Sequence, residues 1–129
     1  MKVRWVYHPN VVTIDGWEKV DEAARRMREG GFGSLPVMSG DDLMGIITEH
    51  DVVQAVAEGQ SGTASVFDYM TEAPKTIRAD DDCLVAATQM LAIGCRHLPV
   101  VESGKVIGMV SARDLLPLVT VTSEAVRVT

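Results

Sequence analysis

Long apolar runs are missing from this chain of 129 residues, although 47% of its residues are hydrophobic. A membrane helix needs roughly 18 or more consecutive apolar residues, and the hydrophobic residues here are interrupted by charged ones. We therefore expect a cytoplasmic protein with no membrane partner.

Basic residues are also in short supply. Twelve lysines and arginines stand against eighteen aspartates and glutamates, which gives a net charge of −6. A negative protein repels a phosphate backbone at long range, so nucleic acid is an unfavourable partner. Only a local basic spot is expected to hold a small anion.

Cysteine is scarce, and the spacing of Cys83 and Cys95 fits neither a CxxC pair nor a zinc-ligand pair. The three histidines show no recognisable metal-ligand spacing either. We therefore predict no metal site. A chain of this length buries roughly two-thirds of its unfolded surface on folding, so it needs no disulfide as a staple.

An internal repeat organises the chain, because shifting the sequence by 63 residues aligns its halves without a gap. The aligned identities include Thr13-Ile14 with Thr76-Ile77, Ala23-Ala24 with Ala86-Ala87, Met27 with Met90, Leu35-Pro36-Val37 with Leu98-Pro99-Val100, Gly45 with Gly108, and Asp51 with Asp114. The repeat predicts two units, which we bound at 1–63 and 64–129.

Each unit is predicted to run β-α-β-β-α. The expected elements of the first unit are a strand at 11–14, a helix from the acidic start at 15–18 to Gly30-Gly31, strands at 34–38 and 43–48, and a helix at 49–57. Those of the second are a strand at 75–77, a helix from 80–82 to Gly94, strands at 97–101 and 106–111, and a helix from 112 to about 118. Residues 2–7 and 119–129 alternate apolar and polar side chains, as strands do.

One such unit is too small to bury its sheet alone. The predicted fold class is therefore α/β (α+β), with two β-α-β-β-α repeats packed sheet to sheet about a pseudo-two-fold axis.

The repeated motifs resemble a known family, the cystathionine-beta-synthase (CBS) domain. The first copy reads Gly31-Phe32-Gly33-Ser34-Leu35-Pro36-Val37 with Gly45-Ile46-Ile47-Thr48-Glu49-His50-Asp51, and the second reads Gly94-Cys95-Arg96-His97-Leu98-Pro99-Val100 with Gly108-Met109-Val110-Ser111-Ala112-Arg113-Asp114. The resemblance covers residues 7–118. Tandem copies form a Bateman module, a regulatory unit that commonly binds AMP, ADP, ATP or S-adenosylmethionine in clefts between its two repeats.

Two candidate sites follow from the resemblance, residue by residue. In the first, the resemblance gives Asp51 to the ribose, Thr48 and His50 to the phosphate, and Ile14, Gly33, Ser34 and Pro36 to the adenine pocket. In the second, Asp114, Ser111 and Arg113 take those roles, with Ile77, Arg96, His97 and Pro99 around the base and phosphate.

The chemistry of these residue types agrees with that assignment. A carboxylate accepts hydrogen bonds from both cis hydroxyls of a ribose. Thr48 and Ser111 lie where a strand meets a helix, so hydroxyl and amide groups there can face an anion. Arg96 and Arg113 give the second site more fixed positive charge, which favours a phosphorylated ligand.

Simpler interpretations stay open at these positions. Asp51 and Asp114 can serve only as helix-terminal carboxylates, which stabilise by about 0.3–1 kcal/mol. Arg96, His97 and Arg113 can serve only as solvated or ion-paired surface residues.

Regulation without catalysis is the predicted function, because no set of nucleophile, base and orienting group is visible. We expect a non-enzymatic sensor that requires no cofactor and binds an adenosine nucleotide as its regulatory ligand. It forms a homodimer and signals by conformational change to a separate effector protein, which the sequence does not name. The alternative is a ligand-free dimerisation or protein-interaction module.

Overall fold

The computed structural model describes residues 1–9, 12–72 and 75–116. The chain divides into two compact units, one formed by residues 12–74 and the other by residues 1–11 together with 75–129. The N-terminal segment thus belongs with the second repeat, whereas the sequence boundary at 63/64 groups it with the first.

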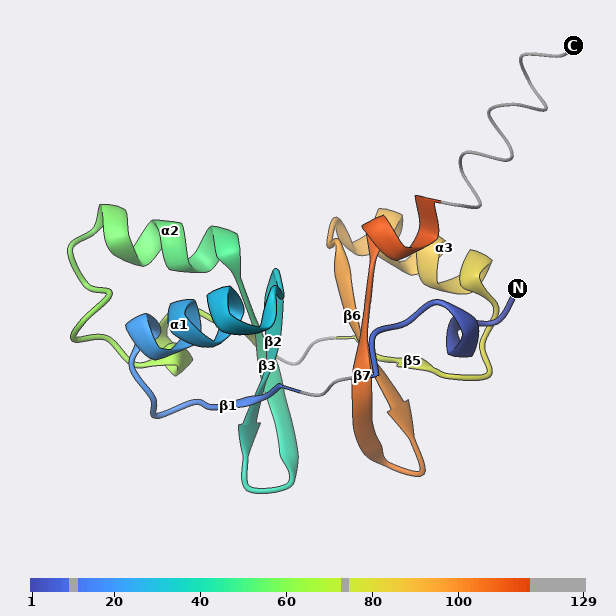
Figure 1. Ribbon diagram of the computed structural model, residues 1–129, viewed down its shortest axis with the longest axis horizontal. Coiled ribbons are helices and arrows are strands. Elements are labelled where there is room, and N and C mark those ends of the chain that lie inside the picture. Colours follow the sequence, from blue (N-terminus) through green and yellow to red (C-terminus); the bar gives the residue numbers. More distant parts are fainter. Residues whose placement is uncertain (10–11, 73–74, 117–129) are drawn as a thin grey trace, which may run out of the picture. The chain divides into compact units, whose positions relative to one another are not determined.

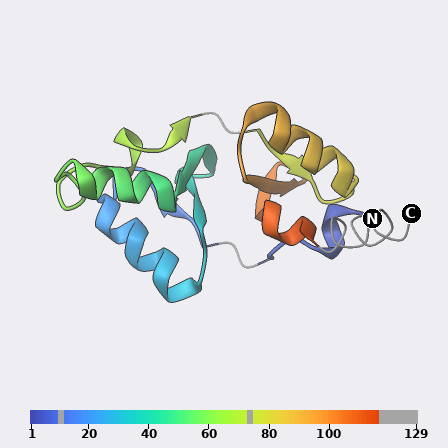
Figure 2. The same cartoon turned by 90° about the horizontal axis from the view of Figure 1, so that it is seen from above.

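The unit of residues 12–74 alternates strands and helices in the predicted order. Its elements are β1 (Ile14–Asp15), α1 (Val20–Gly30), β2 (Ser34–Ser39), β3 (Asp42–Thr48), α2 (Glu49–Ala57), the 3-10 helix η2 (Val66–Asp68) and β4 (Thr71–Glu72). The described strands form one sheet in the order β1-β2-β3-β4, with β1 parallel to β2 and the later pairs antiparallel. Figures 1 and 2 show α1 and α2 on the same face of this sheet.

The other unit repeats this arrangement. Its elements are the 3-10 helix η1 (Val3–Trp5), β5 (Ile77–Arg78), α3 (Cys83–Ile93), β6 (His97–Glu102), β7 (Lys105–Ser111) and the 3-10 helix η3 (Ala112–Leu115). The described strands form a sheet in the order β5-β6-β7. The predicted mixed α/β class with a β-α-β-β core in each repeat is confirmed.

Local sequence explains where the helices begin and end. The Asp82 carboxylate caps α3 by accepting a hydrogen bond of 2.8 Å from the amide of Leu84. Gly31 and Gly94 end α1 and α3 with φ of 72° and 78°, a left-handed conformation that disfavours residues with a Cβ atom. Both helices therefore stop at the glycines that the sequence marks.

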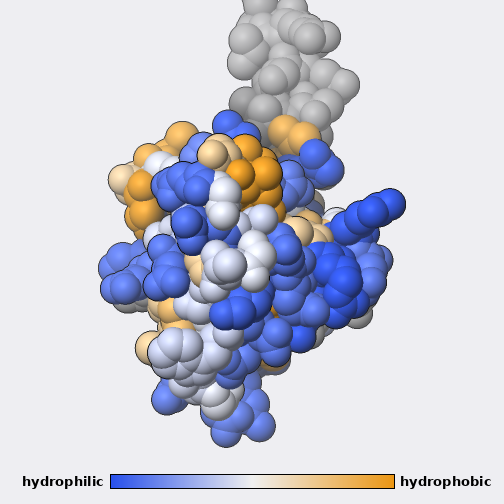
Figure 3. Space-filling view, turned by 90° about the vertical axis from the view of Figure 1, so that its left-hand side faces the viewer, coloured by the Kyte–Doolittle hydropathy of each residue, from blue (hydrophilic) through white to orange (hydrophobic). Residues whose placement is uncertain are grey.

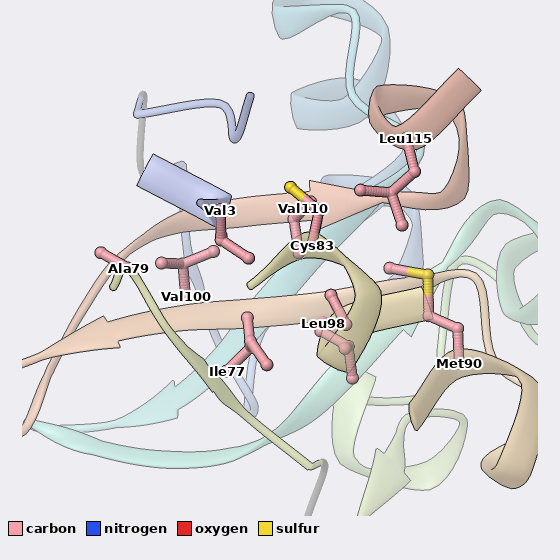
Figure 4. Close-up of a cluster of buried hydrophobic side chains, with 10 residues drawn as sticks. Val3, Ile77, Ala79, Cys83, Met90, Leu98, Val100, Val110 and Leu115 are labelled. Atoms are coloured by element: carbon pink, nitrogen blue, oxygen red, sulfur yellow. The ribbon is translucent and has the colours of Figure 1, made fainter. Parts of the chain in front are cut away.

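Each unit has its own core beneath its helices. In the unit of residues 12–74, the buried residues that pack together are Ile14, Ala23, Met27, Leu35, Val37, Ile47 and Val66. In the other unit they are Val3, Ile77, Ala79, Cys83, Ala86, Met90, Leu98, Val100, Val110 and Leu115, drawn in Figure 4. The core positions repeat at the offset of 63, including Val3 with Val66.

The N-terminal segment is not the strand that its alternation predicts. Val3–Trp5 forms η1, in which the amides of Trp5 and Val6 donate to the carbonyls of Lys2 and Val3. Among the described residues of this segment, strand-like pairing is confined to isolated bridges of Lys2 with Asp82 and of His8 with Met109. The Arg4 guanidinium also pairs with Asp80, and this bond holds the pKa of the Asp80 carboxyl below its usual value. The prediction of a strand here was wrong.

Two further predictions concern the C-terminal end of the chain. The predicted second helix of the second repeat is the 3-10 helix Ala112–Leu115 over the described residues, not a regular α-helix. The alternating segment at 119–129 lies outside the described residues.

Candidate ligand-binding site

The corner between β3 and α2 brings together two residues of the first predicted site. Thr48 caps α2, and its hydroxyl accepts a hydrogen bond of 3.3 Å from the amide of Asp51. In return, Oδ2 of Asp51 accepts bonds from the Thr48 amide at 2.8 Å and from the Thr48 hydroxyl at 3.0 Å. The two side chains form a capping box, the reciprocal arrangement that satisfies free amides at a helix start.

The corner between β7 and η3 repeats this geometry in the second repeat. Ser111 caps η3 and accepts a bond of 3.4 Å from the amide of Asp114. Oδ2 of Asp114 accepts from the Ser111 amide at 2.7 Å and from the Ser111 hydroxyl at 3.1 Å. The two motifs therefore build the same corner twice.

The second oxygen of each carboxylate distinguishes the corners. None of the hydrogen bonds of the described residues reaches Oδ1 of Asp51. Oδ1 of Asp114 lies 3.0 Å from Nε2 of His8. The capping box thus uses only Oδ2 of each aspartate. Oδ1 of each takes no part in the cap.

Other residues of the first predicted site lie beside this corner. Ser34, which is only 4% exposed, stands opposite Thr48 in the β2–β3 ladder. The carbonyl of Gly33 accepts a bond of 3.1 Å from the amide of Glu49. His50 is exposed in the first turn of α2.

The residues predicted around adenine are more deeply buried. Ile14 and Ile77 are 1% exposed and belong to the two hydrophobic cores. Pro36 and Pro99 are buried in β2 and β6. These side chains are therefore packed inside their units rather than exposed at the corners.

The basic residues of the second predicted site lie beside the corner between β7 and η3. His97 stands opposite Ser111 in the β6–β7 ladder. The carbonyl of Arg96 accepts a bond of 2.8 Å from the amide of Ala112, so the backbone of Arg96 is fixed beside the capping box. The side chains of Arg96 and Arg113 are exposed.

Sequence reasoning missed His8 as a neighbour of the second corner. A signal was present, because the offset of 63 aligns His8 with Thr71, which lies in β4 beside the first corner's strand. Extending the repeat by a few residues towards the N-terminus would have placed His8 beside β7.

A hollow of about 380 Å³ lies elsewhere in the unit of residues 12–74. It is lined by Gln54, Glu58, Gln60, Ala64, Asp68 and Tyr69. The Tyr69 hydroxyl donates a bond of 2.7 Å to Glu58, and this bond lowers the pKa of the Glu58 carboxyl. None of the predicted site residues lines this hollow.

No helix among the described residues is both long and apolar enough to cross a membrane. In the same part of the chain, histidine, cysteine and acidic side chains do not gather into a group of three that could hold a metal ion.

The fold and the doubled corner define a class of protein, the tandem β-α-β-β repeat. The CBS domain family matches residues 6–58 and 66–121. The chain belongs to this family, with one copy in each match.

Known proteins with the same domain extend the comparison. Inosine-5′-monophosphate dehydrogenase of Korarchaeum cryptofilum is 39% identical over 107 residues, which are 82% of this chain and 22% of that enzyme. This chain thus spans about a fifth of the enzyme's length.

Solved structures of the family superpose on most of the chain. A putative signal-transduction protein with CBS domains from Burkholderia ambifaria has a TM-score of 0.78 and 33% identity, covering 86% of this chain and 83% of its own. The CBS domain pair of protein MJ0100, in complex with 5′-methylthioadenosine and S-adenosyl-L-methionine, has a TM-score of 0.85 and 23% identity, covering 95% and 98%.

Proposed function

We propose that this chain is a non-catalytic regulatory module that binds an adenosine nucleotide, AMP, ADP or ATP, and signals by a change of conformation. The observation that carries the proposal is the capping-box corner built once in each repeat, with the Asp51 and Asp114 carboxylates at equivalent places. Membership of the CBS domain family supports it. A neighbour of the same fold holds two adenosine compounds.

The ribose is the part of the ligand that these carboxylates suit. In the first repeat, the capping box fixes Asp51 through Oδ2, while no hydrogen bond of the described residues occupies Oδ1. A carboxylate held in this way is already oriented, so a ribose hydroxyl that donates to it does not have to restrict the side chain further. The ligand therefore binds to a prepared acceptor.

The phosphate is the part that the second repeat suits better. Arg96 and Arg113 flank the second corner and are exposed to an incoming anion. The corresponding residues of the first repeat are Gly33 and His50. Because arginine is always charged and presents several donors to phosphate oxygens, the second site is the stronger candidate for a phosphorylated ligand.

The test is a comparison of ligand binding in the wild-type chain and in the Asp51→Asn and Asp114→Asn variants. AMP, ADP, ATP, S-adenosylmethionine and GTP are titrated into each protein by isothermal titration calorimetry. Asparagine keeps an oxygen acceptor for the capping box and removes the charge. We expect adenosine ligands to bind and the altered site to lose about 1.5–3 kcal/mol of affinity, which is tenfold or more in Kd.

Asp41→Asn is the matched control, because Asp41 is an exposed acidic residue outside both corners. It removes the same charge and should leave every Kd unchanged. Equal binding in all variants would show that the carboxylates do not hold the ligand. No binding of any nucleotide to the wild-type chain would exclude the sensor function.

The proposal also includes a location and an output. We place the module in the cytoplasm, as a homodimer that passes its signal to a separate effector protein. Because a ligand shifts a conformational equilibrium only by its differential affinity for the two states, the effector must distinguish the ligand-bound arrangement from the free one.

A second candidate function is a ligand-free dimerisation or interaction module, and the surface of α3 favours it. Leu84 and Leu91 on this helix are 71% and 85% exposed. α3 (Cys83–Ile93) carries no charged residue, whereas α1 presents charged residues such as Arg25 and Glu29. An exposed apolar helix face is typical of a protein interface.

Sedimentation velocity of the wild-type chain and of Leu91→Glu tests this candidate. A dimer formed through α3 should dissociate in the variant, because the charge would be buried without a partner. Val53→Glu is the control, since Val53 is 64% exposed on α2. A dimer that survives Leu91→Glu but not Val53→Glu would place the interface on α2, which also exposes Val56. Figure 3 shows hydrophobic surface near the top of the face that it draws.

A further inference from the structure

The N-terminal segment is fixed along the free edge of β7. The amide of His8 donates to the carbonyl of Met109 at 2.9 Å, and the amide of Met109 donates back at 3.1 Å. Gly108 allows this approach, because a Cβ atom there would lie 2.0 Å from the carbonyl oxygen of His8. The backbone of His8 is thus held in place beside the second corner.

The side chain of His8 extends from this edge to the carboxylate of Asp114. Nε2 of His8 lies 3.0 Å from Oδ1 of Asp114. The Asp114 side chain is 10% exposed and the His8 side chain is 62% exposed. The imidazole therefore contacts one oxygen of a nearly buried side chain, while most of its own surface is open to solvent.

The first repeat lacks this cover. Thr71, in β4, takes the place of His8 and stands opposite Ile46 of β3, as His8 stands opposite Met109 of β7. A threonine side chain is much shorter than an imidazole, and the hydrogen bonds of the described residues leave Oδ1 of Asp51 without a partner. The two corners differ in this one neighbour while their capping boxes match.

We propose that His8 sets the affinity of the second site, because its imidazole occupies the carboxylate oxygen that a ribose hydroxyl needs. This inference rests on the proposed function, in which Asp114 binds the ribose. A ligand at the second site must displace His8 from Oδ1, whereas a ligand at the first site displaces no side chain. The N-terminal segment is thereby part of the second site and lowers its affinity.

Exchanging the two residues between the repeats tests the inference. His8→Thr is made in an Asp51→Asn background, so that the second site alone is measured, and Thr71→His is made in an Asp114→Asn background. AMP is titrated by calorimetry into each double variant and its parent. We expect His8→Thr to tighten AMP binding by roughly three- to tenfold and Thr71→His to weaken it by a similar factor.

The outcomes separate this inference from the proposed function. If AMP binds the parent and His8→Thr leaves Kd unchanged or weakens binding, the inference is overturned and the proposed function stands. If neither the wild-type chain nor any parent binds AMP, ADP or ATP, both are overturned. The imidazole nitrogen resonances of His8 provide a check on folding and on the contact, since Asp114→Asn should shift them in the free protein.

Discussion

Single residues at the two corners have a structural role and, in the proposed function, a binding role. Thr48 and Asp51 bond to each other in both directions, and the start of α2 depends on that exchange. The same carboxylate keeps one oxygen outside the capping box. If Asp51 also binds the proposed ligand, one side chain serves both the stability of the fold and the binding of that ligand. Substitutions must therefore be chosen to separate the two roles.

Replacing Thr48 tests the structural half of this pair. Thr48→Ala removes the hydroxyl that caps α2, and we expect the free energy of unfolding to fall by about 1 kcal/mol, with a decrease in Tm of about 4 °C. Thr48→Ser keeps the hydroxyl and should stay near the wild-type value. Urea denaturation followed by circular dichroism measures both, and equal stability of the two variants would argue against the capping box.

The two cysteines differ in environment and should differ in reactivity. Cys83 is fully buried in the core, and burial raises the pKa of its thiol. Cys95 is only half-buried. Because the thiolate is the reactive form, iodoacetamide at neutral pH should modify Cys95 first and Cys83 only after unfolding. Peptide mass spectrometry gives the order, and early labelling of Cys83 would contradict the packing of α3.

At the scale of elements, the two repeats bury side chains at equivalent positions but expose different side chains to solvent. α1 and α3 bury equivalent residues, Ala23 and Met27 in one and Ala86 and Met90 in the other. Their outer faces differ, with charged side chains on α1 and exposed leucines on α3. The same fold therefore presents a charged helix face in one repeat and an apolar one in the other.

Helix termination gives a prediction at this scale. Gly94 ends α3 with φ of 78°, and an added Cβ would meet no atom within 4 Å. Gly94→Ala should therefore cost only the backbone strain of a left-handed residue, about 1–2 kcal/mol in unfolding free energy. Gly94→Asn should cost less, because asparagine tolerates this conformation. Chemical denaturation of the two variants tests the order, and equal values would exclude backbone strain as the cause.

The sequence predicted the regular elements well and the N-terminal segment poorly. The hairpin at 34–48 was found because strand-like residues flank Gly40-Asp41, a local signal that needs no information from elsewhere. For Val3–Trp5, alternation fits a strand, but the amide of Val3 is held by the carbonyl of Asp81. A bond between residues so far apart in the chain leaves no periodic trace in the sequence.

For the candidate sites too, the sequence pointed to some residues and not to others. Asp51 and Asp114 are predicted as site residues because motif and repeat agree on them. Their capping role was foreseen as an alternative and is present at both corners. His8 was not foreseen, because its closeness to Asp114 depends on the N-terminal segment running along β7.

At the scale of the whole molecule, the unit that contains the second repeat also contains the N-terminal segment. Val3 is 0% exposed in the core of that unit, and Val66 is 0% exposed in the core of the other. Val3→Ala and Val66→Ala should each cost about 2 kcal/mol, because two methyl groups leave a packed core.

Amide hydrogen exchange shows which unit each variant weakens. Val3→Ala should speed exchange in β6 and β7, and Val66→Ala should speed it in β2 and β3. Faster exchange in β2 and β3 after Val3→Ala would contradict the placement of the N-terminal segment.

This division of the chain also imposes an order on the folding of the two units during synthesis. Residues 12–74 form a continuous segment, so that unit can complete its contacts while later residues are still being added by the ribosome. Residues 1–9 leave the ribosome before this unit, yet the carbonyls that hold the amides of Val3 and Arg4 belong to Asp81 and Ala79. Val3, which is 0% exposed in the folded protein, therefore has no core to enter until the second repeat emerges. A segment made before the first repeat thus reaches its final contacts only after that repeat can be complete.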